Sequence, residues 1–274
     1  MVRKDRLHEC FRPYIRNKDK YERQKQSKNA LRISILSGLN PEELLRQMEH
    51  CLNRCSERLR GLLAYRKARF IYLSLSPLME QMRYNALMDG KIVVLPSPRL
   101  KNSFFLLDPA SIAPSARLVA VRTNRISKYG RQIDFKTCRK PFIDMTVSEV
   151  VAANTRTGAL LCDGTGFYDL HRGVMALLGW LKKDCLSVAC VDGRNAGRHL
   201  MIPVKENDSI ADYVVTPEGV IQINEKKSRR PVLIGEILDA RTIRRSNVLF
   251  YIFRELLGVS DFFNFRFLRT FDTK

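Results

Sequence analysis

Residues 161–170 (Leu-Cys-Asp-Gly-Thr-Gly-Phe-Tyr-Asp-Leu) have types and a spacing that suit the binding of a phosphate group. The segment joins an apolar run to a predicted helix. Gly164 and Gly166 let backbone N–H groups approach an anion closely, and the N-terminus of the helix adds positive potential. The two glycines alone also fit a tight structural turn. Asp169 either serves the site or stabilises the helix N-terminus.

Few other residues are spaced for catalysis or metal binding. Cys162, in the same loop, is either a low-pKa thiol beside a helix N-terminus or a small residue in a turn. His171 follows Asp169 by two residues, and we expect it on the helix surface. The seven cysteines form no Cys-x-x-Cys pair, and no histidine has the spacing of a metal ligand. We therefore expect free and mostly buried thiols.

The hydrophobic pattern predicts the elements that must position these residues. A strand at 69–75, a helix at 77–89 and a strand at 91–95 predict a parallel βαβ unit. Asn40, followed by a proline and two acidic residues, predicts the start of an earlier helix. Further predicted elements are a short strand at 118–121, an apolar strand-like run at 145–153, a helix at 168–181, strands at 186–191 and 213–216, and a last helix at 241–257. Strands that alternate with helices indicate an α/β layered fold.

Composition and charge limit the class of protein. The chain has 274 residues, of which 45% are hydrophobic, as in globular proteins. No apolar run is long enough to cross a bilayer and no secretory signal opens the chain, so we expect a soluble, cytoplasmic protein. The formal charge is +20, and residues 1–70 carry +10 of it. Residues 1–27 are basic and include aromatics (Phe11, Tyr14, Tyr21), which permits contact with nucleic acid but also fits a solvated basic face.

Several segments, in order, resemble motifs of the 5-formyltetrahydrofolate cyclo-ligase family (methenyltetrahydrofolate synthetases), especially its longer "synthetase domain-containing" branch. The glycine loop resembles G-x-G-x-G-Y-x-D, and residues 28–32 (Lys-Asn-Ala-Leu-Arg) resemble K-x-x-[LI]-R. The other matching segments are 81–83, 86–91, 96–100, 128–130 and 203–217, the last similar to P-x-x-x-H-D-x-x-x-D-Y-I-x-T-P. The resemblance spans roughly residues 28–257.

The resemblance implies a three-layer α/β sandwich with a mostly parallel sheet, similar to sugar isomerases and CoA transferases. It implies a ligase of one-carbon metabolism that uses ATP and Mg²⁺ to convert 5-formyltetrahydrofolate, a reduced folate, into 5,10-methenyltetrahydrofolate. Lys28 and Arg32, which share a helix face, would contact phosphates and act in catalysis, because the transferring phosphoryl group is anionic. The other implied roles are ATP binding by Gly164, Thr165, Gly166, Phe167 and Tyr168, metal binding by Asp169, and substrate binding by Arg83 and Tyr129. Residues 1–27 would be an N-terminal extension and 28–274 the cyclo-ligase-like domain.

The chain also departs from the family's motifs. Cys162 and Asp163 stand where the loop usually has a glycine and a basic or aromatic residue, and a second carboxylate beside a triphosphate is unfavourable. Residues 76–79 (Ser-Pro-Leu-Met) replace an E-x-x-T segment that contacts folate in the short enzymes, and Asn207 replaces a histidine. Two hypotheses follow. The protein is either a cyclo-ligase or a catalytically lapsed member that binds a nucleotide or RNA through its basic surface.

Overall fold

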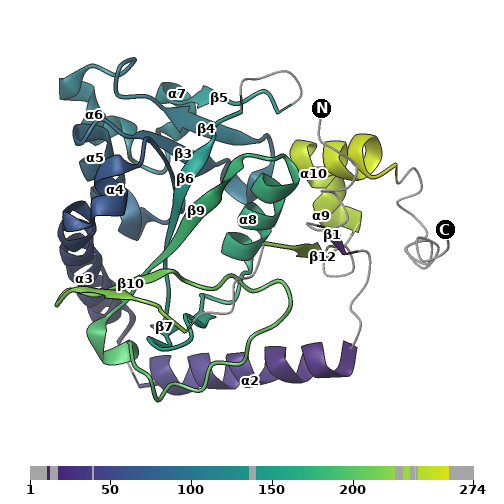
Figure 1. Ribbon diagram of the computed structural model, residues 1–274. Helices are drawn as coiled ribbons and strands as arrows, with labels where there is room; N and C mark the ends of the chain where they lie inside the picture. The colour runs from purple at the N-terminus through teal and green to yellow at the C-terminus, as the bar shows by residue number, and fades with distance from the viewer. Residues whose placement is uncertain are drawn as a thin grey trace.

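The computed structural model of the protein describes residues 11–12, 18–38, 40–135, 140–225, 231–234, 238 and 240–258. Its main sheet has eight strands, which are β2 (Phe70–Leu73), β3 (Ile92–Pro96), β4 (Phe104–Leu107), β5 (Arg131–Gln132), β6 (Ile143–Glu149), β9 (Leu181–Cys190), β10 (Tyr213–Val215) and β11 (Val220–Gln222). The strand order is β11-β10-β9-β6-β2-β3-β4-β5 (Figure 1). All neighbours from β10 to β3 pair in parallel, whereas the outer pairs are antiparallel. The predicted βαβ unit and mostly parallel sheet are confirmed.

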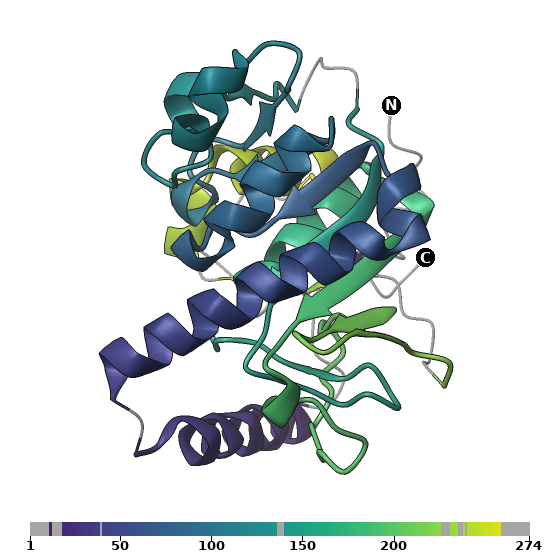
Figure 2. The same cartoon turned by 90° about the vertical axis from the view of Figure 1, so that its left-hand side faces the viewer.

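Helices cover both faces of this sheet, which gives the predicted three layers (Figures 1 and 2). One face carries α3 (Pro41–Gly61), α4 (Leu63–Lys67), α5 (Glu80–Met88), α6 (Arg117–Ala120) and α7 (Ile126–Tyr129). The other carries α8 (Phe167–Leu177), α9 (Ala240–Arg245) and α10 (Asn247–Tyr251). Successive strand residues point to opposite faces, so Ile71 and Leu73 pack on the first layer and Tyr72 on the second. Strands β2 and β3 are apolar throughout because both of their faces are buried.

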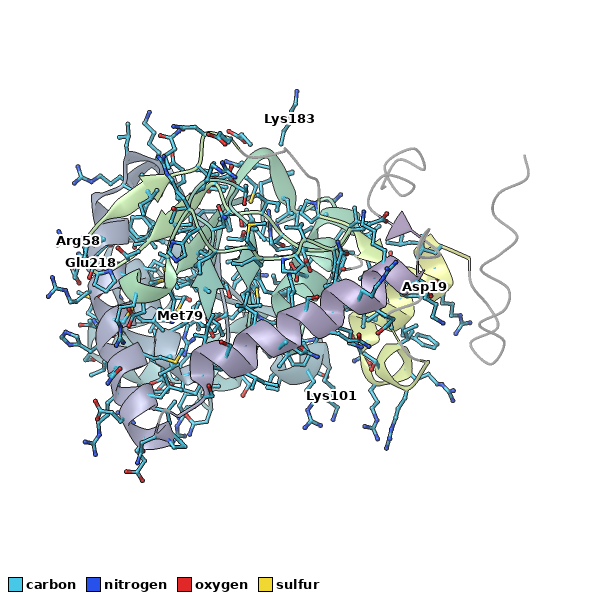
Figure 3. All side chains as sticks on the ribbon, turned by 90° about the horizontal axis from the view of Figure 1, so that it is seen from below. Asp19, Arg58, Met79, Lys101, Lys183 and Glu218 are labelled. Carbon is cyan, nitrogen blue, oxygen red and sulfur yellow. The ribbon has the colours of Figure 1, made fainter. Side chains whose placement is uncertain are left out.

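A long polar helix, α2 (Lys18–Leu36), lies across the edge of the sheet where the parallel strands end (Figures 1 and 3). Leu31 and Ile35 pack against the small hairpin of β7 (Ala152–Ala153) and β8 (Leu160–Leu161), which follows β6. The helix runs without interruption across the predicted boundary between residues 27 and 28. A further short pair, β1 (Phe11–Arg12) with β12 (Leu233–Ile234), is parallel. The rest of residues 1–17 lies outside the described residues.

Helix α3 begins where the sequence predicts. The Asn40 side chain accepts hydrogen bonds from the backbone N–H groups of Glu42 at 2.9 Å and Glu43 at 3.4 Å. Pro41 occupies the first turn, where its missing N–H has no helical partner to lose. The cap and the apolar stripe of α3 therefore fix the helix that covers the first face.

Three predicted elements differ in the structure. The predicted strand at 118–121 is wrong: Arg117–Ala120 forms the helical turn α6, because so short an apolar run fits a buried helix as well as a strand. The helix predicted to reach 181 ends at Leu177, since Gly179 adopts a φ of +69° and β9 begins at Leu181. The last helix is interrupted at Ser246, whose side chain caps α10 by accepting from the Leu249 N–H at 3.3 Å.

Candidate functional site

The glycine loop connects β8 to α8 and has a backbone that side chains disfavour. Gly164 and Gly166 adopt φ values of +98° and +73°, in the left-handed region where glycine carries no penalty. Asp163 stabilises the turn, because its Oδ1 accepts hydrogen bonds from the Thr165 backbone N–H at 2.9 Å and from the Thr165 hydroxyl at 2.8 Å. The carboxylate that departs from the family pattern thus serves the shape of the loop.

Helix α2 brings Lys28 and Arg32 to the start of this loop. The Arg32 Nε donates to the Cys162 carbonyl at 2.6 Å, and its guanidinium is 3.3 Å from the position that a Cβ on Gly164 would take. The Lys28 Nζ donates to the Leu160 carbonyl at 3.2 Å and to Asp208 Oδ2 at 2.6 Å. The shared helix face predicted for the two cations is confirmed. Lys28 is only 5% exposed and forms a buried ion pair.

A large pocket, here called the basic pocket, opens beside the loop and has a volume of about 980 Å³. Its charged lining has five cations (Lys18, Lys25, Lys28, Arg32, Lys205) and two acids (Glu22, Asp169). The loop contributes residues 164–167, and the N-terminus of α8 is part of the same wall. Cations, loop N–H groups and a helix N-terminus all favour an anion, so this pocket suits a phosphorylated ligand.

Asp169 lines the basic pocket and lies close to a second carboxylate, Asp208. Asp169 Oδ1 accepts a hydrogen bond from the Ser209 backbone N–H at 2.7 Å. Burial, and then the neighbouring charge of Asp208, raise the pKa of Asp169 above its ordinary value. Within the described residues, no group of three or more His, Cys, Asp and Glu side chains could hold a metal. Mg²⁺ needs only one or two carboxylates when phosphate oxygens complete its shell, so Asp169 fits a metal that arrives with a phosphorylated ligand.

A second pocket, here called the strand-end pocket, lies at the carboxyl ends of β2, β3 and β6 and has a volume of about 340 Å³. Ligands of open α/β sheets commonly bind at this edge. Its lining combines rings and prolines with polar groups (Tyr72, Ser74, Pro96, Pro98, Glu149, Phe167, Tyr168, His171). Thr165 and Phe167 line both pockets, so the glycine loop is a wall that the two share.

Glu149 and His171 are the titratable groups that sequence reasoning missed or misplaced in the strand-end pocket. Glu149 Oε2 accepts a hydrogen bond from the Ser74 hydroxyl at 2.5 Å, and burial raises the pKa of Glu149 above its ordinary value. The prediction of a surface histidine is wrong, because His171 is 6% exposed and packs against Tyr72, Phe104 and Phe167. Burial lowers the pKa of His171 to about 3, so its ring is neutral at neutral pH.

The comparison with protein families agrees with this geometry. A family model described as "5-formyltetrahydrofolate cyclo-ligase family" matches residues 24–217, which include most of α2, the glycine loop and Asp208. The chain belongs to the 5-formyltetrahydrofolate cyclo-ligase family. No match was found among the curated proteins. Among the described residues, no helix is long and apolar enough to cross a membrane.

Three residues that the family resemblance assigns to ligands have other places in the structure. Arg83 is fully buried and donates to the carbonyls of Val121, Ser74 and Ser76, so it supports the strand-end pocket from behind. Tyr129 is half-buried, packs against the core on the α3 face and lines neither pocket. Tyr168 lines the strand-end pocket instead of the basic pocket, with its hydroxyl 3.0 Å from both the Thr146 and Ser187 hydroxyls.

The departures from the family's motifs also have structural explanations. Ser76, at the first position of the E-x-x-T segment, accepts a hydrogen bond from the Leu78 N–H at 3.3 Å and so begins a short 3-10 turn. Burial raises the pKa of the Cys162 thiol well above its ordinary value, which disfavours the reactive thiolate considered from the sequence. Asn207 lines the basic pocket, and its buried Oδ1 has no hydrogen-bond partner within the described part of the chain.

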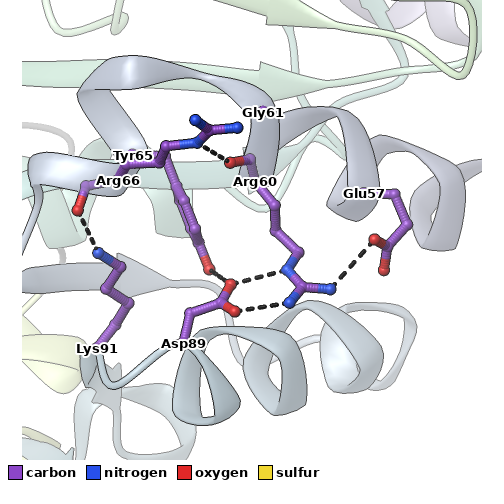
Figure 4. A pocket seen from close by; sticks show the side chains of 7 residues that line it. All are labelled: Glu57, Arg60, Gly61, Tyr65, Arg66, Asp89 and Lys91. Atoms are coloured by element: carbon purple, nitrogen blue, oxygen red, sulfur yellow. Dashed lines mark hydrogen bonds and ion pairs between the residues drawn. The ribbon is translucent and has the colours of Figure 1, made fainter.

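A third pocket, of about 580 Å³, shares no residue with the other two and is a structural junction (Figure 4). Asp89 accepts hydrogen bonds from Arg60 at 2.7 and 2.8 Å and from the Tyr65 hydroxyl at 2.9 Å. Lys91 donates to the Arg66 carbonyl at 2.7 Å. Because these charges satisfy one another and tie α3 and α4 to the end of α5, we assign the cluster to stability.

Proposed function

We propose that this protein is an active cyclo-ligase that uses ATP and Mg²⁺ to convert 5-formyltetrahydrofolate into 5,10-methenyltetrahydrofolate. The observation that carries the proposal is the shared wall. Thr165 and Phe167 face both a basic pocket and a pocket lined by rings and polar groups. Phosphoryl transfer needs the phosphate donor and the acceptor to meet at one point. Two pockets that adjoin at the glycine loop would allow one ligand in each to meet there.

The basic pocket would hold the triphosphate. The N–H groups of the glycine loop and the N-terminus of α8 point positive charge at the phosphates, and Arg32 adds a fixed cation because Cys162 and Asn29 hold it in place. Asp169 would hold Mg²⁺ together with phosphate oxygens, and the bound metal neutralises phosphate charge. This role also explains a buried acid in a mostly cationic pocket, because a bound metal would offset the cost of burying the charge of Asp169.

The strand-end pocket would hold the reduced folate with its formyl group toward the loop. The formyl oxygen attacks the γ-phosphorus and the bond to ADP breaks, which leaves a phosphorylated formyl imidate. N10 then attacks the formyl carbon and loses its proton to solvent, and the original formyl oxygen leaves in inorganic phosphate. Rings and prolines at this edge keep water away from the imidate, which hydrolysis would otherwise destroy.

Steady-state kinetics of an α2 variant tests the proposal. Arg32→Ala removes the cation at the loop, and we expect kcat/KM for methenyl formation to fall about 100-fold or more, as when one transition-state donor is lost. Arg23→Ala, on the exposed side of the same helix, is the matched control and should keep wild-type kinetics. Absence of ATP-dependent methenyl product from folded wild-type protein would overturn the proposal.

One observation favours the alternative, a lapsed member that binds a nucleotide or RNA. Lys28, the family's phosphate-contacting lysine, is engaged by Asp208 and a backbone carbonyl. A salt titration separates the two hypotheses. The affinity for a nucleic acid falls steeply as the salt concentration rises, because counterions displaced from many phosphates return to them. Turnover of a folate with ATP should not show so steep a dependence on salt.

A further inference from the structure

The chain lacks one carboxylate where the short enzymes have it and holds another in the same pocket. Ser76 stands at the glutamate position of the E-x-x-T segment, which follows β2. Glu149 ends β6, the parallel neighbour of β2, with Leu73 opposite Val147. This register brings Glu149 beside the residues that follow β2, and its Oε2 accepts the Ser74 hydroxyl at 2.5 Å. Ser76 and Glu149 both line the strand-end pocket.

A second, independent polar group points to a ligand in this pocket. His171 is more than nine-tenths buried, and its Nδ1 lies 2.7 Å from the Tyr72 hydroxyl. Within the part of the chain that the structure describes, its Nε2 has no hydrogen-bond partner. Phe167, from the glycine loop, stacks on the imidazole with ring centres 5.8 Å apart and planes 10° apart. Buried polar atoms are nearly always paired, so a ligand atom is the expected partner of Nε2.

The pocket's shape and donors restrict what that ligand is. A volume of about 340 Å³, bounded by aromatic rings and prolines, suits a planar bicyclic ring and leaves no room for a nucleotide beside that ring. An ionised carboxylate accepts several hydrogen bonds, and the Ser74 hydroxyl accounts for one of them. Two adjacent N–H groups, on a ring nitrogen and on an amino group, match a carboxylate as a fork.

We propose that Glu149 reads the heterocycle of the substrate, supplying from β6 the carboxylate that the E-x-x-T segment supplies in the short enzymes. The ring is a pteridine with a 2-amino group beside a ring N–H. Glu149 accepts from both, and His171 Nε2 pairs with a further polar atom of the ring. This inference rests on the proposed function only for the identity of the second substrate. It makes Glu149 the specificity-determining residue of the strand-end pocket.

Equilibrium binding without ATP tests the inference. The probes are pteroic acid and its 2-oxo counterpart, in which a carbonyl oxygen replaces the amino group. We expect the wild-type protein to prefer the amino compound by about tenfold or more, because the oxo group presents a lone pair to the carboxylate. Glu149→Gln should weaken binding of the amino compound about 10- to 100-fold and abolish the preference. His171→Asn, which retains a group near Nδ1 and removes Nε2, should weaken both probes.

A relocated carboxylate is the sharper variant. Ser76→Glu in a Glu149→Ser background returns the acid to the E-x-x-T position, and we expect it to restore much of the affinity and the preference for the amino group. Glu57→Gln, a carboxylate of the third pocket, is the matched control and should bind both probes as the wild type does. Circular dichroism shows that each variant is folded.

The outcomes separate this inference from the proposed function. Glu149→Gln that keeps both the affinity and the preference overturns the inference, even if the protein makes methenyltetrahydrofolate. A wild-type protein that binds neither probe overturns it as well. A wild-type protein that discriminates the probes through Glu149 but makes no methenyl product supports the inference and overturns the proposed function.

Discussion

Lys28 gives the most quantitative prediction, because its ion pair is buried. Lys28→Met keeps most of the length of the side chain and removes its charged nitrogen. Asp208 then loses its closest cation, whose Nζ lies 2.6 Å away in the wild type, and keeps Lys205, whose Nζ is 3.8 Å from its other oxygen. The Leu160 carbonyl also loses a donor at 3.2 Å. Leaving one charge of a buried pair wholly unpaired costs about 3–5 kcal/mol of unfolding free energy, and because Lys205 stays beside Asp208 we expect the lower end of this range. The charge of Lys28 also lowers the pKa of Asp169, so the loss of Lys28 should raise that pKa further.

Urea unfolding followed by circular dichroism measures this cost. At about 3 kcal/mol, the thermal midpoint of a chain of this size should fall by roughly 6–12 °C. Lys25→Met removes a lysine from the same helix whose partner, Glu22, is 4.0 Å away with both side chains about half exposed. An exposed pair of this kind contributes under ~1 kcal/mol, so this control should unfold close to the wild type.

A double-mutant cycle with Asp208→Asn isolates the pair. The double variant Lys28→Met with Asp208→Asn should lose less unfolding free energy than the sum of the two single variants, because the second change removes the buried charge that Lys28 balances. We expect a coupling free energy of about 2 kcal/mol. The reasoning is refuted if Lys28→Met and Lys25→Met destabilise the protein equally, or if the single costs simply add.

Three further predictions concern the loop and two carboxylates. A Cβ on Gly164 would lie 3.3 Å from the Arg32 guanidinium, so Gly164→Ala should lower kcat/KM about tenfold or more. A Cβ on Gly166 meets open space, so Gly166→Ala should keep wild-type kinetics and cost only ~1 kcal/mol of stability in urea unfolding. Equal kcat/KM values for the two variants would contradict this. Burial alone would raise the pKa of Asp144, but Lys182 and two backbone N–H groups lower it, so its stabilising contribution is present above its unfolded pKa and is lost as pH falls through its folded pKa. The difference in unfolding free energy between wild type and Asp144→Asn should therefore shrink from neutral pH to about pH 2, and a constant difference would refute it. The pKa of Glu149 is raised in the folded protein, so its ionisation lowers stability as pH rises. Glu149→Gln should therefore have a higher thermal midpoint than the wild type at neutral pH and lose that advantage below about pH 4. A lower midpoint for the variant at neutral pH would count against the burial of this carboxylate.

The sequence predicts the parts of the fold that local patterns determine. Apolar runs bounded by Pro, Gly and Asn locate β2, α5 and β3, and Asn40 locates the start of α3, because strand burial and helix capping depend on neighbours in the chain. The turn α6 could not be predicted, since four apolar residues carry too little periodicity. The end of α8 depends on Gly179, whose positive φ is a property of the packed structure.

Local sequence patterns predict only part of the candidate site. Gly164, Gly166 and the α2 cations are suggested by spacing and by the family's motifs. The partner of Lys28 is 180 residues away in the chain, and the burial of His171 follows from packing against Tyr72, neither of which periodicity reports. Glu149 did carry a signal, because it is an acid within an apolar run at 145–153. Read as the end of a parallel strand, that position predicts a ligand-facing side chain.

The most direct test of the two-pocket account follows the formyl oxygen. We would supply 5-formyltetrahydrofolate carrying oxygen-18 in its formyl group, with ATP and Mg²⁺, and analyse the inorganic phosphate by mass spectrometry. Transfer of a phosphoryl group across the glycine loop to the formyl oxygen predicts one labelled oxygen in each phosphate released, in step with methenyl product. Unlabelled phosphate, or ATP hydrolysis without methenyl product, would contradict the account.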